Sequence, residues 1–255
     1  MVSITAEQHV SVPVLRASWL DMTLVHWPVP PDRVQRLLPA GLRIDEFDGT
    51  AWVGWTPFVM AKMRPLAVPD LSFGSSSVPG PRKVSRMRDL SSTAETNLRT
   101  YVRGPDGRDG VWFLSLDIGN PVLAAVLRGA VGAPYHYARL TVQRQGDTIT
   151  YAGSRVGASQ SYRLQTRPGA SIHEPSGLEV WLSGRWRAYT KHLGRLLVTP
   201  VEHEPWPLRA ASLDLAEENL TDAVGLSGLS DPPLVHFSDG VHKVRLGRPT
   251  LVPGQ

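Results

Sequence analysis

Short segments with alternating side chains, separated by tight-turn residues, recur along almost the whole of this chain of 255 residues. Alternation with a period of two is typical of β-strands, and Asp-Gly or other Gly-containing pairs between such segments favour hairpins. Many strands with a few short helices predict a β-dominated α+β fold. We expect strands over 13–27, 42–47, 51–63, 93–103, 111–118, 135–145, 148–155, 159–166, 186–192, 195–202 and 208–215, and strand pairs around Asp239-Gly240 within 234–252.

Four short helices are expected, over 30–38, 121–131, 174–182 and 217–226. The second has the clearest boundaries, because Asn120 can cap its start, Pro121 suits its first position and Gly132 can end it.

One segment, 64–90, is rich in Pro, Gly and Ser and shows no periodicity. A long irregular segment in a compact domain is usually functional or disordered, so we expect a mobile loop able to cover a pocket. Neither a repeat nor a linker divides the sequence. Residues 1–255 are therefore expected to form one domain.

Composition excludes several classes of protein. The chain has no cysteine, which excludes disulfides, thiolate catalysis and cysteine-bound zinc. No signal peptide and no apolar run of about 18 residues are present, so we expect a cytoplasmic protein without a membrane span. The net charge of +4 comes mainly from arginines spread along the sequence. Nucleic-acid binders usually concentrate their charge, so no nucleic-acid partner is predicted.

Familiar catalytic and metal-binding motifs are missing. The sequence contains no GxGxxG, GxxxxGK[ST] or GxSxG, and no two histidines are four residues apart. Glu202-His203-Glu204 looks like a ligand group, but on a strand His203 would face away from both glutamates. We therefore predict no metal site and no cofactor, while a serine–histidine–aspartate triad assembled in space stays open.

The most informative strand covers 95–103, because one of its faces is polar throughout. Alternation places Glu95, Asn97, Arg99, Tyr101 and Arg103 on that face, opposite Thr96, Leu98, Thr100 and Val102. If the polar face lines a barrel interior, it forms a pocket with a carboxylate beside arginines. If it faces water, it is an ordinary exposed face.

A second strand, 135–143, presents the same two alternatives. Tyr135, Tyr137, Arg139, Thr141 and Gln143 share one face, and His136, Ala138, Leu140 and Val142 share the other. Two such strands in one domain make a shared polar cavity more plausible.

Several stretches, in order along the chain, resemble those of a known family. They are 27–30, 37–39, 95–102 (ETNLRTYV), 110–117, 134–138, 186–190 and 205–208 (PWPL, preceded by Glu204). On these stretches the chain resembles the YqjF-like bacterial family (domain of unknown function 2071), a branch of the acetoacetate decarboxylase-like superfamily. The resemblance implies a closed, cone-shaped β-barrel with a few short peripheral helices and an internal pocket, and it favours an inward orientation of Glu95.

The chain departs from the decarboxylases of that superfamily at the residue that carries their chemistry. Their motif resembles Tyr-Pro-Lys-Lys, whose first lysine forms a Schiff base, whereas this chain has Tyr135 and His136 in the corresponding place. A phenol or an imidazole cannot form an imine, so no Schiff-base decarboxylation is expected. Lys62 or Lys191 could supply an amine from another strand. Ser183-Gly184-Arg185 also stands where the family suggests Thr-Glu-Arg.

These observations lead to one functional hypothesis and its rivals. The resemblance favours a cofactor-free enzyme of lyase, isomerase or cyclase type, acting by general acid–base chemistry on a carbonyl-containing or enolisable small molecule, for example in natural-product biosynthesis. The rivals are a barrel that binds a small ligand without turnover and a structural partner of another protein. Self-association into a homo-oligomer stays open. The candidate catalytic residues are Glu95, Tyr135 and His136, and the candidate substrate-binding residues are Asn97, Arg99, Tyr101, Arg103, Tyr137 and Arg139.

Overall fold

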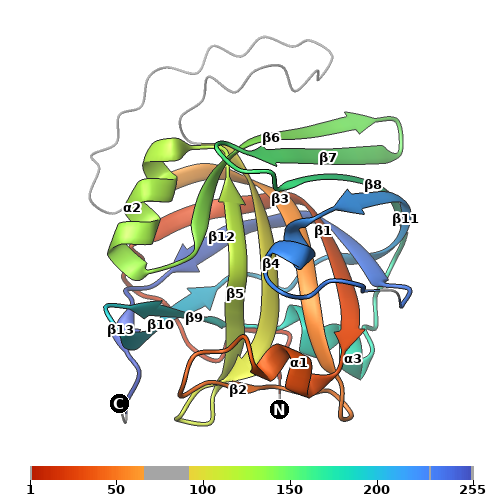
Figure 1. Ribbon diagram of the computed structural model, residues 1–255. Coiled ribbons are helices and arrows are strands. Elements are labelled where there is room, and N and C mark those ends of the chain that lie inside the picture. The colour runs from red at the N-terminus through yellow and green to blue at the C-terminus, as the bar shows by residue number, and fades with distance from the viewer. Residues whose placement is uncertain (1, 66–91, 230, 254–255) are drawn as a thin grey trace.

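The computed structural model describes residues 2–65, 92–229 and 231–253. Its strands form one continuous, strongly curved sheet with short helices around it (Figure 1). The strands are β1 (Leu15–Val29), β2 (Arg43–Ile44), β3 (Ala51–Pro65), β4 (Thr93–Arg103), β5 (Asp109–Ile118), β6 (Tyr135–Gln145), β7 (Thr148–Arg155), β8 (Ser161–Ser171), β9 (Arg187–His192), β10 (Arg195–Glu202), β11 (Leu208–Glu218), β12 (Leu234–Leu246) and β13 (Thr250–Leu251). The helices are α1 (Pro31–Gln35), α2 (Pro121–Val131), α3 (Gly177–Ser183) and α4 (Leu220–Ala223).

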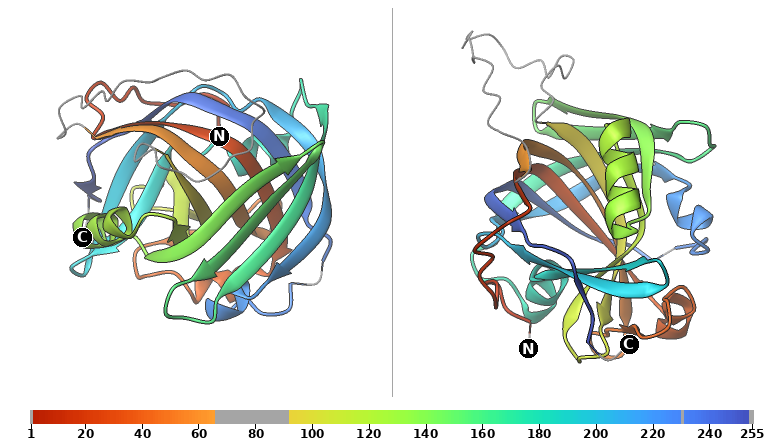
Figure 2. Two further views of the ribbon diagram at one scale, coloured as in Figure 1. Left: turned by 90° about the horizontal axis from the view of Figure 1, so that it is seen from above. Right: turned by 90° about the vertical axis from the view of Figure 1, so that its left-hand side faces the viewer.

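The sheet closes on itself twice. Nine strands form a closed barrel in the order β1, β3, β4, β5, β6, β7, β8, β11 and β12, and the predicted barrel fold is confirmed. A second closure comes from the pairing of β10 with β12, so that β12, β1, β3, β4, β5, β9 and β10 enclose a second ring. Seen from above, the strands curve around a common axis (Figure 2).

The strands shared by the two rings form a wall with both faces covered. One face of this wall packs into an apolar core that contains Trp55, Leu98 and Tyr162. The other face packs against two further clusters, which contain Phe58 and Trp181. Every residue of β4 except Arg103 is therefore buried or half-buried. Burial on both faces excludes the alternative in which the polar face of β4 is exposed to water.

Local sequence signals place α2 as expected. Its N-terminal amide, the backbone N–H of Leu123, donates to Oδ1 of Asn120 at 3.0 Å, and Gly132 ends the helix with φ of 66°. The hairpin of β4 and β5 also lies where the alternation predicted it.

Other predicted boundaries are wrong. The expected helix over 217–226 shrinks to α4, because β11 continues to Glu218 in its pairing with β8. The expected turn at Asp239-Gly240 is also absent, because β12 passes through both residues while it pairs with β1. Arg64 and Pro65 belong to β3, and the rest of the predicted loop, 66–90, lies outside the described residues.

The helices lie around the ends and one side of the barrel. Helices α1 and α3 lie near one end, and the β6–β7 hairpin lies at the other (Figure 1). No helix among the described residues is long and apolar enough to cross a membrane.

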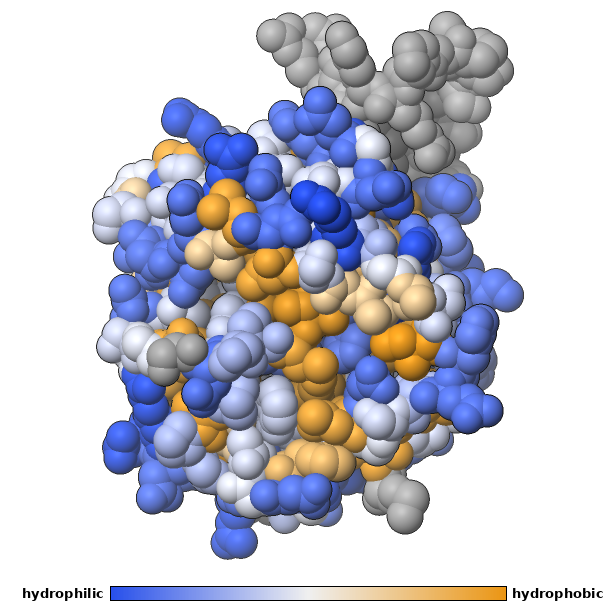
Figure 3. Space-filling model, turned by 90° about the vertical axis from the view of Figure 1, so that its right-hand side faces the viewer, coloured by the Kyte–Doolittle hydropathy of each residue, from blue (hydrophilic) through white to orange (hydrophobic). Residues whose placement is uncertain are grey.

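One face of the molecule carries a band of apolar side chains bordered by hydrophilic ones (Figure 3). Self-association stays a prediction.

Candidate functional site

Glu95 lies near the start of β4, on the face that points into the second ring, and only 3% of it is exposed. Its Oε1 accepts a hydrogen bond from the hydroxyl of Tyr135 at 3.2 Å, and its Oε2 is buried without a partner. Burial raises the pKa of Glu95 to about 8 and outweighs the opposing effect of the Tyr135 hydrogen bond. At neutral pH this group is therefore mainly a carboxylic acid, which differs from the arginine-paired carboxylate suggested by its neighbours in the sequence.

Tyr135 reaches Glu95 because of the way β6 begins. Helix α2 ends at Gly132, and β6 then pairs in parallel with β5, with Tyr135 beside Leu116. Burial and the neighbouring Glu95 carboxyl raise the pKa of Tyr135 well above its usual value. The phenol is thus a neutral hydrogen-bond donor, and the structure brings together these two predicted residues.

Asn97 and Arg99 continue the same face of β4 beyond Glu95. Asn97 is 7% exposed and its Oδ1 is buried without a hydrogen-bond partner. Arg99 is half-buried, its Nε has no partner, and no carboxylate of the described residues lies within ion-pair distance of it. Buried polar atoms are rarely left unpaired in proteins, so these two side chains are candidates for contacts with water or a ligand.

Tyr101 and His26 form a hydrogen-bonded pair deeper along this face. The Tyr101 hydroxyl lies 2.7 Å from Nε2 of His26, whose Nδ1 is buried without a partner. Burial, and then the charge of Arg99, lower the pKa of His26 well below its usual value, so its ring is neutral. Gly54 makes room for this pair, because a Cβ there would lie 3.0 Å from Cδ2 of His26.

Aromatic side chains lie around the carboxyl group of Glu95. Phe58 is the cross-strand partner of Glu95. The ring of Trp19 packs edge-on against the ring of Phe58, with 5.9 Å between the ring centroids. Trp19 also contacts His203, whose pKa is lowered to about 4 by burial. The site thus combines an apolar wall with a few unpaired polar groups, which is typical of small-molecule sites.

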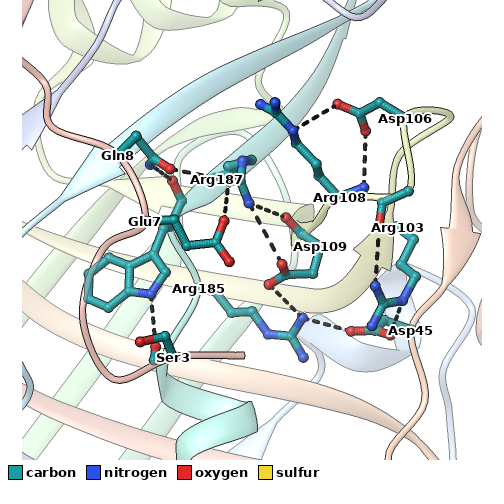
Figure 4. A network of polar contacts seen from close by, with 12 residues as sticks. Ser3, Glu7, Gln8, Asp45, Arg103, Asp106, Arg108, Asp109, Arg185 and Arg187 are labelled. Atoms are coloured by element: carbon teal, nitrogen blue, oxygen red, sulfur yellow. Dashed lines mark hydrogen bonds and ion pairs between the residues drawn. The ribbon is translucent and has the colours of Figure 1, made fainter. Parts of the chain in front are cut away.

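Arg103 was predicted to hold a substrate, but the structure places it away from the other residues of this face. Its side chain is 47% exposed, and its Nε donates to Asp45 at 2.8 Å. Asp45 also binds the buried Arg185, which in turn binds Asp109 (Figure 4). Arg103 therefore belongs to a structural ion network, away from Glu95 along the strand.

Tyr137 and Arg139 are both exposed, although they were expected to line the cavity. Beyond its first residues β6 leaves β5 and pairs only with β7, so this face of β6 meets solvent. The predicted contacts of these two residues with a ligand in the cavity are therefore not supported by their positions.

His136 lies on the opposite face of β6 from Tyr135. It is the parallel partner of Asp117, which forms a buried ion pair with Arg155 at 2.7 Å. Burial, and then the charges of Arg155 and Arg128, lower the pKa of His136 to about 4. Of the three predicted catalytic residues, Glu95 and Tyr135 therefore contact each other, whereas His136 lies on the other face of β6 and does not face Glu95.

The Asp117–Arg155 pair and the His26–Tyr101 pair were not predicted from the sequence. Asp117 carried a usable signal, because a lone acid within the apolar segment 113–118 would need a buried partner. Arg155 and His26 had no such signal, since their partners lie 38 and 75 residues away in sequence.

A gap in the barrel wall lies beside the site. Along one edge, β5 pairs first with β9, up to Trp112, and then with β6, from Leu116 onwards. The residues of β5 between these two points have no partner strand on that edge among the described residues. A cavity of about 410 Å³ occupies this gap. Phe113, the cross-strand partner of Arg99, lines it. The other lining residues are Leu37, Trp112, Leu114, Gly132, Pro134, Tyr189, Thr190, Lys191 and Val224.

Comparison with known proteins identifies the family. Residues 16–242 match the DUF2071 family, described as "Uncharacterized conserved protein". The chain belongs to the DUF2071 family. It is 30% identical over 241 residues to the "Uncharacterized protein YqjF" of Bacillus subtilis (strain 168), covering 91% of this chain and 92% of that protein.

Solved structures relate this DUF2071 member to the acetoacetate decarboxylase-like fold. Acetoacetate decarboxylase from Legionella pneumophila superposes with a TM-score of 0.63 at 15% identity, covering 94% of this chain and 87% of that one. The enduracididine biosynthesis enzyme MppR, complexed with pyruvate, gives a TM-score of 0.63 at 14% identity, covering 96% and 93%. At these identities the likeness establishes the fold, and this fold includes enzymes.

The described lysines of this DUF2071 chain are exposed, whereas Glu95 is buried. They are Lys62, Lys191 and Lys243, and Lys83 lies outside the described residues. Lys191 lines the cavity beside β5, but no described lysine forms a hydrogen bond or ion pair with Glu95.

Gly184 stands where the family suggests a glutamate, and the structure leaves no space for a side chain at this position. A side chain at residue 184 would collide with the backbone of Ser3, whose carbonyl also accepts a hydrogen bond from the indole of Trp186. The N-terminal segment therefore occupies the space that a glutamate side chain would need at Gly184.

Proposed function

We propose that this chain is a small-molecule enzyme that moves protons to and from a carbonyl-containing or enolisable substrate, without a Schiff base and without a cofactor. One observation carries the proposal: Glu95 is buried, its pKa is raised to about 8, and its Oε2 has no partner. Carboxyls tuned towards neutral pH by burial are suited to general acid–base catalysis.

The proposed chemistry needs only one proton carrier. In its ionised form, Glu95 takes a proton from the carbon beside the substrate carbonyl, and the electron pair of the broken C–H bond forms an enolate. In its acid form, Glu95 returns the proton to that enolate at carbon. Tyr135, which donates to Oε1, orients the carboxyl so that Oε2 is left for the substrate.

Arg99 and Asn97 are the proposed substrate-binding groups, with Tyr101 and His26 behind them. A guanidinium without a carboxylate partner suits a carboxylate or an enolate oxygen. The neutral ring of His26 and the hydroxyl of Tyr101 offer hydrogen bonds. The cavity in the gap beside β5 supports access for a small molecule from outside the barrel.

A small keto acid is the proposed substrate class. Pyruvate is bound by the structurally similar enzyme MppR, and the fold is shared with an acetoacetate decarboxylase. A keto acid also matches the site, because it combines a carboxylate for Arg99 with an enolisable carbonyl for Glu95. MppR further supports a role in natural-product biosynthesis.

Exchange of the methyl protons of pyruvate for deuterium tests this proposal. We expect wild-type protein in D₂O to catalyse the exchange, Glu95→Gln to lose it, and the exposed control Glu46→Gln to retain it. Equal exchange rates for wild type and Glu95→Gln would contradict the assigned role.

A non-catalytic ligand-binding barrel is the alternative. It is favoured by the same unpaired atoms, because Oδ1 of Asn97, Nε of Arg99 and Nδ1 of His26 could hold a ligand without any reaction. In that case pyruvate or acetoacetate would bind, as measured by ligand-observed NMR, and the protein would not accelerate the proton exchange of either.

A further inference from the structure

Three arginines stand directly opposite one another across three neighbouring strands. Strands β12, β1 and β3 are adjacent in the sheet, and Arg16 of β1 pairs with Arg245 of β12 on one side and with Arg64 of β3 on the other. Cross-strand partners share a face, with their Cβ atoms about 5 Å apart. Like charges in such positions repel one another, so this row destabilises the sheet unless something compensates it.

The described residues provide little compensation. Neither Arg16 nor Arg64 lies within ion-pair distance of a described carboxylate. Arg245 donates from Nη2 to the carbonyl of Ser11 at 3.3 Å, and its Nε is buried without a partner. An unsatisfied buried guanidinium nitrogen beside two unpaired arginines points to a missing acceptor.

Two acids lie on the segments that border the row. The carboxylate of Glu204 accepts from the backbone N–H groups of His242 and Lys243 at 2.6 and 3.0 Å. Glu202 is the cross-strand partner of Arg245, so one negative charge lies beside the end of the row, but its carboxylate accepts from the backbone N–H of Val10 at 2.6 Å and contacts His9. Neither acid forms an ion pair with Arg16, Arg64 or Arg245.

A groove runs over this row and gathers further cations. It encloses about 360 Å³. The pairing of β1 with both neighbours shifts register here, and Lys62 adopts a left-handed backbone with φ of 53°. A non-glycine residue in this conformation is strained, and such strain often accompanies a functional position. The groove is lined by Arg16, Ala17, Ser18, Lys62, Arg64, His242, Lys243, Val244 and Arg245.

We propose that this basic groove binds a small polyanion with at least two phosphate groups. Adjacent strands are about 4.8 Å apart, so the outer arginines, Arg64 and Arg245, are separated by about 10 Å. A diphosphate or triphosphate chain can contact all three guanidinium groups while the side chains stay apart, whereas one phosphate would need the three like charges to converge. The volume of the groove suits a small molecule rather than a long polymer.

The groove is distinct from the Glu95 site. Phe58 is the partner of Glu95, and Lys62 lies four residues further along β3, about 13 Å away for an extended strand. The polyanion site therefore does not depend on the proposed acid–base function.

Calorimetric titration with inorganic diphosphate at low salt tests the proposal. We expect one site per chain, tighter binding of diphosphate than of orthophosphate, and affinity at least tenfold weaker in Arg16→Gln. The matched control is Arg195→Gln, which removes an exposed arginine on β10 and should bind like wild type. Absence of diphosphate binding, or equal weakening in both variants, would overturn the proposal.

Thermal unfolding separates binding from a structural role of Arg16. If the row is a site, Arg16→Gln should unfold at a higher temperature than wild type without ligand, because the repulsion between the arginines is relieved. Diphosphate should also raise the unfolding temperature of Arg16→Gln by less than it raises that of wild type. A lower unfolding temperature with unchanged diphosphate affinity would make Arg16 structural and would contradict the site. Tighter binding of a single-stranded oligonucleotide than of diphosphate would also contradict it.

Discussion

Replacing Glu95 with glutamine should remove a large part of the pH dependence of stability. The pKa of Glu95 is raised from 4.5 to about 8 in the folded protein. A group with a raised folded pKa holds its proton more tightly in the native state. Its contribution to stability is therefore complete below about pH 4.5 and is lost as the pH rises through about 8. One pKa unit corresponds to about 1.4 kcal/mol, so the loss for Glu95 is about 5 kcal/mol over this interval.

Urea denaturation at several pH values between about 5 and 8 measures this loss. All other titrating groups remain in the Glu95→Gln variant, so the difference between the two curves isolates Glu95. We expect the free energy of unfolding to fall more steeply with pH in wild type than in the variant, while Glu46→Gln should follow wild type. Parallel curves for wild type and Glu95→Gln would refute the inference that burial keeps this carboxyl protonated.

Three further predictions follow from the same geometry. Tyr135→Phe removes the hydrogen bond that lowers the pKa of Glu95, so the Glu95 pKa should rise further in an NMR titration; an unchanged value would disprove the contact. Arg155→Met leaves Asp117 buried without its partner and should destabilise the protein by about 3–5 kcal/mol in urea denaturation, whereas the double change with Asp117→Asn should recover part of this loss. Borohydride reduction in the presence of acetoacetate should leave the intact mass unchanged, and a covalent adduct on any lysine would contradict the absence of a Schiff base.

Local signals in the sequence were sufficient for parts of the fold. Asn120, Pro121 and Gly132 define α2 because capping and proline preferences act within a few residues. The alternation along β4 correctly grouped Glu95 and Asn97 on one buried face, because strand geometry fixes which side chains share a face.

Strand order decided what the local pattern could not. Tyr135 and His136 belong to opposite faces of β6 by alternation alone, but only the pairing of β6 with β5 determines that Tyr135 meets Glu95. Likewise, alternation places Arg103 on the same face of β4 as Glu95 and Arg99. Its ion pair could not be predicted, because its partner Asp45 lies 58 residues away in sequence. Contacts between distant segments depend on the closure of the whole sheet, which a single strand does not encode.

The most direct test of the central claim is the titration of Glu95 itself. The side-chain carboxyl carbons of ¹³C-labelled glutamate can be followed by NMR across pH, and the Glu95 signal is assigned by its absence from the Glu95→Gln variant. The buried acid described above predicts a midpoint of about 8 for this signal. A midpoint near 4.5, the ordinary value for a glutamate, would contradict it.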